Sequence, residues 1–239
     1  MNTETLDLGD LVIEVIFKDI KNVHLSVHPP TGRIRLAAPA WMSMDTLRLY
    51  AIAKLDWIKK QQTKLRAQAR ETPREYLDRE SHSVWGRRYL LQIHEEDRPP
   101  VIELHPQHLH LTLRPDTSPD KREALLAAWY RAQLHAALPP LLAKWEPALG
   151  VHPTRVLFRH MKTKWGSCNP ATGTLLLNTE LAKKPPECLE YVLVHELVHL
   201  LERHHNARFQ ALMDQFLPHW KLSREELNRM PLGAEKWEY

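Results

Sequence analysis

The stretch that decides the fold lies towards the C-terminal end, where residues 187–206 read ECLEYVLVHELVHLLERHHN. Its apolar residues recur at helical spacing and form a broad face, so we expect one buried helix over about 187–202. This helix contains an H-E-x-x-H motif, formed by His195, Glu196 and His199. Two histidines and a glutamate buried side by side are costly unless a bound metal ion satisfies them, so the motif predicts a metal site.

Helix geometry brings the two histidines of the motif to one side. His195 and His199 differ by roughly 400° around the axis and by about 6 Å along it, so both imidazoles can reach one ion. Glu196 points about 100° away from His195, where it can address a metal-bound water without being a ligand. Zinc lowers the pKa of such a water towards about 7, and Glu196 is then placed to take its proton as general base.

A catalytic zinc ion needs a third protein ligand. Glu202 lies about 10.5 Å from His195 along the helix, too far to share the ion, and on a continued helix His204 would face roughly the opposite side. The ligand must therefore follow a chain reversal, which the good N-cap residue Asn206 supports. Geometry alone leaves both His204 and His205 open.

The rest of the C-terminal half reads as helices around a few strands. The expected elements are a helix over Asp120–Gly150 interrupted at Pro139-Pro140, strands over Arg155–Arg159 and Thr174–Asn178 with a Gly-Ser-Cys-Asn-Pro loop between them, and a helix over about 207–217. Pro218 ends the last helix.

The N-terminal half is dominated by strand patterns. Alternating apolar residues on both sides of Pro30-Thr31-Gly32 predict a β-hairpin, and a helix capped by Ser43 or Asp45 is expected to run to about Ala69. A polar connector is expected over residues 70–83. Further strands are expected over Leu11–Phe17, Tyr89–Ile93, Val101–Leu104 and Leu109–Leu113.

The best domain boundary is the turn-rich stretch Pro115–Pro119. We therefore expect an α+β protein in two parts. Residues 1–118 form a β-hairpin-rich region that includes a helix, and residues 119–239 form a helical metal-hydrolase domain with a small sheet.

Composition excludes several classes of protein. The chain has 239 residues, of which 43% are hydrophobic, so it is not disordered. The most apolar run, Leu189–Leu201, is interrupted by charged residues and histidines, and Met1–Asp10 does not resemble a signal peptide, so we expect neither a membrane span nor export. Two cysteines, Cys168 and Cys188, cannot form a disulfide framework, and a cytoplasmic protein is expected.

The net charge is +4, which permits nucleic-acid binding without demanding it. Lysines and arginines along the 43–69 helix are spread out and are interpreted as a solvated face. The chain also has 15 histidines, an unusually high number. His24, His28, His108 and His110 occupy the polar positions of alternating strands, so we expect them to face water and to need no function.

The chain resembles the YgjP-like metallopeptidases, zincins related to SprT-type proteins, over most of its length. The resemblance rests on MKTKWGSC at 161–168, LLN at 176–178, and the H-E-x-x-H motif followed after five residues by His205. It implies zinc ligands at His195, His199 and His205, a catalytic Glu196, and a zincin-like fold for the C-terminal domain. Common members have asparagine where this chain has His204.

The residues themselves do not decide which kind of bond the protein hydrolyses. Zincin resemblance favours a peptide, whereas four cations shortly before the metal helix (Arg155, Arg159, Lys162 and Lys164) could serve a polyanion. The alternatives are a metal-dependent nucleoside triphosphate (UTP-type) pyrophosphatase or phosphohydrolase, a protease acting on nucleic-acid-bound proteins, and a non-catalytic metal-stabilised binding module. Other divalent metals could replace zinc.

Three further residues near the motif have open roles. We interpret Cys168 as a packed small residue, because three histidines already complete an open zinc site. Trp165 is interpreted as a residue of the core or of the pocket wall. Asn178 either orients a ligand or ends a strand. The sequence does not indicate an oligomeric state.

Overall fold

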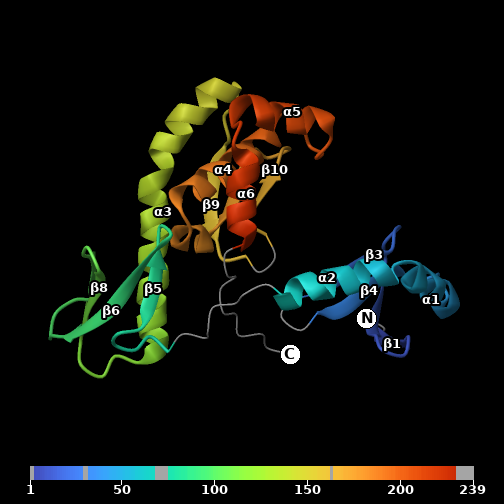
Figure 1. Cartoon of the computed structure of the whole chain (residues 1–239), viewed down its shortest axis with the longest axis horizontal. Helices are drawn as coiled ribbons and strands as arrows, with labels where there is room; N and C mark the ends of the chain where they lie inside the picture. Colours follow the sequence, from blue (N-terminus) through green and yellow to red (C-terminus); the bar gives the residue numbers. More distant parts are fainter. Residues whose placement is uncertain (1–2, 29–31, 68–74, 162–163, 230–239) are drawn as a thin grey trace. The chain divides into compact units, whose positions relative to one another are not determined.

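The structure is a computed structural model that describes residues 3–28, 32–67, 75–161 and 164–229 (Figure 1). The chain divides into two compact units, Met1–Ala69 and Arg70–Tyr239. This division lies about 50 residues before the boundary that the sequence suggests at Pro115–Pro119. The physical reason is a shared core, which joins the strands before that stretch to the helix after it.

The N-terminal unit is a four-stranded sheet with two helices. Its strands are β1 (Thr3–Asp7), β2 (Val12–Lys18), β3 (His24–His28) and β4 (Arg33–Pro39), in the order β1-β2-β4-β3. β3 and β4 pair antiparallel, which confirms the predicted hairpin, although residues 29–31 of its turn lie outside the described residues. Alternate residues of β2 and β4 form the core of this unit, among them Ile13 and Leu36.

The predicted 43–69 helix is two helices, α1 (Met44–Ala53) and α2 (Leu55–Ala67), separated at Lys54. Ser43 caps α1, since its side chain accepts a hydrogen bond from the Thr46 N–H. Nothing in the local sequence explains the break. Lys59 and Lys60 are exposed, as a solvated face requires. The side chains of residues 64–70 are not among those that the structure describes.

The second unit begins with another four-stranded sheet. Its strands are β5 (Ser81–Val84), β6 (Arg87–Glu95), β7 (Val101–Leu104) and β8 (His108–Leu113), in the order β5-β6-β8-β7. The connector predicted over 70–83 therefore ends in a strand. Gly86 fixes the β5–β6 turn against Pro185 of the same unit: its φ is 78°, and a Cβ there would lie 2.8 Å from Pro185 Cγ.

Helix α3 (Pro119–Leu149) joins this sheet to the metal-site region. Contrary to the sequence prediction, Pro139-Pro140 does not interrupt it. A helix loses a hydrogen bond at an interior proline and is destabilised by about 3 kcal/mol. Here the buried stripe of α3, which includes Leu134, Leu138 and Trp145, continues across the prolines and offsets that cost. Gly150 ends the helix at φ 65°, as predicted.

A three-stranded sheet and four short helices complete the unit. The strands are β9 (Arg155–Arg159), β10 (Gly166–Asn169) and β11 (Thr174–Asn178), in the order β10-β11-β9, and the helices are η1 (Thr179–Lys183), α4 (Pro186–Val198), α5 (Ala207–Phe216) and α6 (Trp220–Arg229). The Gly-Ser-Cys-Asn-Pro loop was predicted wrongly, because most of it is the edge strand β10, and α6 was not predicted.

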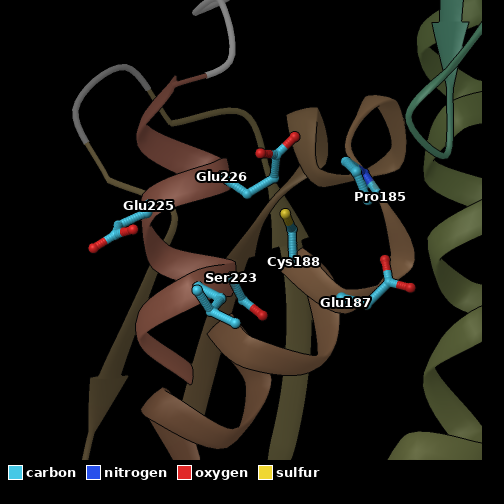
Figure 2. A pocket seen from close by; sticks show the side chains of 7 residues that line it. Pro185, Glu187, Cys188, Ser223, Glu225 and Glu226 are labelled. Carbon is cyan, nitrogen blue, oxygen red and sulfur yellow. The ribbon is translucent and has the colours of Figure 1, made fainter. Parts of the chain in front are cut away.

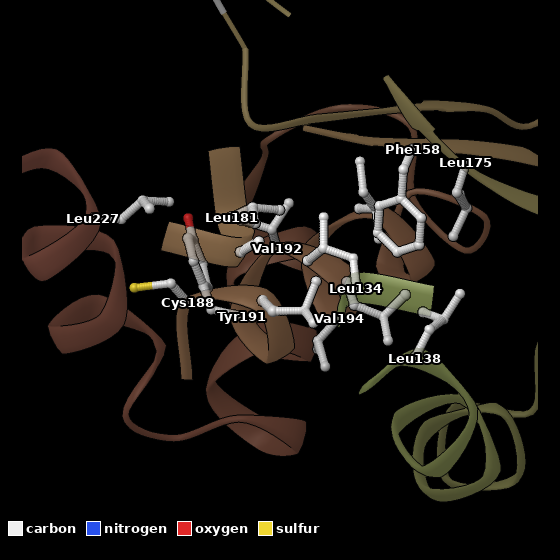
Figure 3. Close-up of a cluster of buried hydrophobic side chains, with 14 of the residues drawn as sticks. Leu134, Leu138, Phe158, Leu175, Leu181, Cys188, Tyr191, Val192, Val194 and Leu227 are labelled. Carbon is white, nitrogen blue, oxygen red and sulfur yellow. The ribbon is translucent and has the colours of Figure 1, made fainter. Parts of the chain in front are cut away.

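The core of the second unit joins α3, the small sheet and α4 (Figure 3). Leu134 from α3, Phe158 from β9 and Val194 from α4 are among its buried members. The fold is therefore α+β, as expected. No helix in the described part of the chain is long and apolar enough to cross a membrane.

Candidate metal centre

Helix α4 carries the H-E-x-x-H motif in its last turn. Pro186 is suited to the first turn of a helix, where its missing N–H costs nothing, and His199 is the C-cap. Leu189, Val192 and Leu193 are buried and hold the helix in the core, as its apolar periodicity predicted. The motif is thus placed at the end of a rigid, buried helix.

The chain reverses directly after the motif. The Glu202 carboxylate accepts a hydrogen bond from the His204 N–H at 3.2 Å, and the Asn206 side chain accepts one from the Phe209 N–H at 3.0 Å. Asn206 is therefore the N-cap of α5, as the sequence predicted. This turn directs His205 back towards α4.

Three histidines converge after the reversal. The Nε2 atoms of His195 and His205 lie 2.9 Å apart. Together with His199, these residues bring three ring nitrogens within 4.8 Å of one another, and among the described residues no other group of three potential ligands does so. The structure thus brings His205, and not His204, into the group. The Phe209 ring packs against all three imidazoles, with centroid distances of 4.7 to 4.9 Å.

The protonation of the histidines suits a metal ion. The Glu202 carbonyl can only accept, so the His199 Nδ1–H at 3.0 Å donates to it and leaves Nε2 free as a ligand. Burial, with His199 and His205 nearby, lowers the pKa of His195 to about 3, which keeps this ring neutral. Burial and neighbouring charges also lower the pKa of His205. The Nδ1 atom of His195 is buried without a hydrogen-bond partner.

Glu196 lies beside the triad with only 5% of its surface exposed. Burial raises the pKa of its carboxyl group to about 8, and the positive charge of Lys164 acts in the opposite direction. Gly166 at the start of β10 provides the space for this side chain, because a Cβ there would lie 2.5 Å from Glu196 Oε1. The sequence prediction missed this contact, although a chain with only seven glycines offered a signal.

Cys168 is half-buried on β10, outside the histidine triad. Burial, together with the nearby Glu196 carboxylate, raises the pKa of its thiol to about 11. Its sulfur is not among the converging ligand atoms, and the side chain packs against the core of the second unit, which agrees with the interpretation of Cys168 as a packed residue.

Asn178 ends β11 and anchors the segment that leads into β10. Its side-chain NH₂ group donates to the carbonyl oxygens of Met161 at 2.7 Å and Lys164 at 2.8 Å. Its side-chain oxygen accepts from the Glu180 N–H and caps η1. Of the two roles left open for Asn178, the contacts correspond to the structural one.

The four cations before the motif do not form one cluster in the described residues. Arg155 and Arg159 are exposed on β9, at the opposite edge of the sheet from β10. Lys162 lies outside the described residues. Only Lys164 acts electrostatically on Glu196.

A cavity of about 450 Å³ lies at the other end of α4 (Figure 2). Its walls include Glu187 and Cys188 from α4 and Glu225 and Glu226 from α6. Cys188 precedes His195 by seven residues, which is about 10.5 Å along a helix. The cavity is therefore separate from the histidine triad.

Comparison with known proteins identifies the class. Residues 21–230 match the family described as "YgjP-like, metallopeptidase domain". The chain therefore belongs to the YgjP-like metallopeptidase family, whose name implies a divalent metal ion. The histidine triad is compatible with such an ion.

The metallopeptidase zymogen of Pyrococcus abyssi abylysin is among the solved structures that are similar to this chain. The two share 25% sequence identity over 37% of this chain and 89% of that one, with a TM-score of 0.35. No curated protein matches the chain.

Proposed function

We propose that the protein is a zinc-dependent peptidase in which His195, His199 and His205 hold the metal ion and Glu196 is the general base. The observation that carries this proposal is the convergence of three ring nitrogens within 4.8 Å beside a buried carboxylate. Three imidazoles suit zinc, although nickel, cobalt or manganese could occupy the same ligands in vitro.

The surroundings of the histidines support a metal ligand set. The hydrogen bond from His199 to the Glu202 carbonyl orients that ring, as outer partners of metal-bound histidines do. His195 is held neutral, and its Nε2 faces that of His205 across 2.9 Å. A cation between these rings would be bound by both nitrogen atoms, which otherwise face each other.

Zinc held there supplies Lewis acidity, which activates water and polarises a carbonyl group. Glu196 accepts a proton at its carboxylate and returns it to the leaving amine. The carboxylate side chain needs the free volume over Gly166 to take its position, and its burial excludes competing water. The motif on α4 and the edge strand β10 thus act together.

A peptide fits the surroundings better than a nucleotide does. β10 is an edge strand next to α4, and an extended peptide can add to such an edge through backbone hydrogen bonds. A triphosphate needs several converging cations. Among the described residues, Lys164 acts on Glu196 and Arg224 acts on His195 and His205, whereas Arg155 and Arg159 lie on β9, at the opposite edge of the sheet from β10. We therefore propose a peptide or protein substrate and the reaction class of amide hydrolysis.

The non-catalytic alternative requires a closed metal site. A structural zinc ion is held by four protein ligands, whereas a catalytic one keeps a position open. Among the described residues, no fourth histidine, cysteine or carboxylate joins the triad. The open position favours catalysis.

The two free cysteines, one of them buried, support a cytoplasmic location.

The substrate class is tested by offering casein and nucleoside triphosphates in parallel to the zinc-loaded wild type and to Glu196→Gln. We expect cleavage of casein by the wild type and a loss of at least about 100-fold in the variant. Phosphate or pyrophosphate release that depends on Glu196, without casein cleavage, would assign the site to phosphoanhydrides. If neither substrate is hydrolysed while zinc binds tightly, the binding-module alternative is supported.

A further inference from the structure

Four histidines gather on one face of the second sheet, far along the chain from the triad. His94 lies on β6, His105 lies in the turn between β7 and β8, and His108 and His110 lie on β8. β6 and β8 are adjacent parallel strands in Figure 1, and their register pairs His110 with Gln92, two residues from His94. Residues two apart on a strand share a face, so the register brings these side chains together.

The four rings form a contiguous cluster centred on His110. The ring centroids of His105, His94 and His108 lie 4.1, 5.0 and 6.1 Å from that of His110. The Nε2 atom of His94 and the Nδ1 atom of His110 are 3.2 Å apart. The alternate residues of β8, Leu109 and Leu111, are fully buried, so the cluster occupies the face directed away from the core.

The nitrogen separation is suited to a shared ion. Two imidazoles bound to one ion at about 2.0 to 2.1 Å in tetrahedral geometry have nitrogens roughly 3.3 Å apart. The separation of His94 and His110 is close to this, and both side chains can be approached from solvent. Among the described residues, only the His195 triad brings three potential ligand atoms together. The second cluster therefore offers a pair of ligands.

The charges around His110 favour the neutral ring that a metal needs. Partial burial, then His105, His94 and His108, lower the pKa of His110, whereas Glu103 on β7 acts in the opposite direction. Glu103 is the antiparallel partner of His110. A divalent ion would relieve the repulsion among clustered imidazoles, and the carboxylate would complement its charge.

We propose that His94 and His110 form a second metal site, which binds a late first-row divalent ion and leaves its remaining positions to water. His105 packs against the His110 ring and holds it towards His94. Imidazole ligands favour Cu²⁺ over Ni²⁺ and Zn²⁺, so Cu²⁺ is the tightest of these ions. The sequence prediction, which gave His108 and His110 a place on a solvent-facing strand and no function, missed the approach of His94 and His105.

Copper binding to the full-length chain tests this site independently of the proposed peptidase activity. In a His199→Ala/His205→Ala background, which disables the triad, we expect one Cu²⁺ per chain in equilibrium dialysis. Its electron paramagnetic resonance spectrum should show coupling to two imidazole nitrogens. Adding His94→Ala or His110→Ala should weaken binding by about tenfold or more and remove one nitrogen coupling. His24→Ala, at an exposed histidine of the other unit, is the matched control.

Two results would refute the second metal site. The site is refuted if the background binds no copper at micromolar concentrations, or if His94→Ala and His110→Ala bind copper as tightly as the background does. In that case the 3.2 Å approach is only a hydrogen bond between two rings. If the double variant does not fold, the same count is made in the otherwise unchanged chain, where His110→Ala should lower the copper content from two ions to one.

Discussion

Gly166 and Glu196 are fitted to each other: a Cβ at position 166 would lie 2.5 Å from the Glu196 carboxylate oxygen and 2.8 Å from its Cγ. Gly166 starts the edge strand β10, and Glu196 lies in the last turn of α4. The absence of a side chain on the strand therefore decides where the buried carboxylate of the helix can lie. This contact links the segment Trp165–Cys168 to the motif 30 residues later in the chain.

The first prediction concerns this contact. Gly166→Ala displaces the Glu196 carboxylate by about 1 Å, because neither helix nor strand can yield without disturbing the core, and should lower kcat by about 100-fold. Zinc content should stay at one ion per chain, since no ligand is touched. Ser167→Ala on the same strand is the control and should keep nearly full activity. A Gly166→Ala variant as active as Ser167→Ala would contradict the steric argument.

The second prediction separates the two adjacent histidines. His205→Ala removes a ring nitrogen from the triad and should weaken zinc binding by more than about 100-fold. His204→Ala removes an exposed side chain outside the triad and should leave the affinity within about twofold. Competition with a chromogenic chelator measures both affinities. A loss in His205→Ala as small as that in His204→Ala would contradict the assignment of His205 as the third ligand.

The third prediction concerns Asn178, which holds the carbonyl groups of Met161 and Lys164. Asn178→Ala leaves these groups without their partner and should lower the free energy of unfolding by about 3 kcal/mol. Asn169→Ala is the matched control, because Asn169 is exposed and, among the described residues, its side chain accepts a hydrogen bond only from the nearby Ala171 N–H. Urea unfolding of both variants measures the difference, and similar values for the two would be inconsistent with the anchoring role.

The fourth prediction concerns the thiols. Burial, followed by the charges of Glu226 and Glu187, raises the pKa of Cys188 to about 12, and burial with the charge of Glu196 raises that of Cys168 to about 11. A raised pKa keeps a thiol protonated, so at pH 8 each native cysteine has more than about 100-fold less thiolate than in the unfolded chain. Reaction with Ellman's reagent should be slow in the native protein and rise with pH up to these values. Fast reaction of either thiol in the native protein at pH 8 would be contrary to this.

Local sequence patterns predict well those elements whose structure depends mainly on their own residues. The spacing of His195 and His199, the apolar face of α4 and the Asn206 cap are local features, and each is present as predicted. The β3–β4 hairpin is likewise decided by alternation and a turn.

The elements that the sequence prediction missed depend on distant partners. Gly166–Asn169 has the composition of a loop and becomes a strand only by pairing with β11. Pro139-Pro140 is tolerated in α3 because residues on both sides are buried against other elements. Helical periodicity leaves both His204 and His205 open, because it does not describe the geometry of a turn; the family resemblance points to His205, which is the histidine that lies beside His195.

The most direct test of the zinc-peptidase account is the rate of peptide hydrolysis by metal-free and zinc-reloaded protein, measured for the wild type and Glu196→Gln at equal zinc content. We expect the wild type to lose activity on removal of the metal and to regain it with one equivalent of zinc. Glu196→Gln should bind the same equivalent and remain at least about 100-fold slower. Hydrolysis that survives removal of the metal, or a reloaded Glu196→Gln variant as fast as the wild type, would contradict the account.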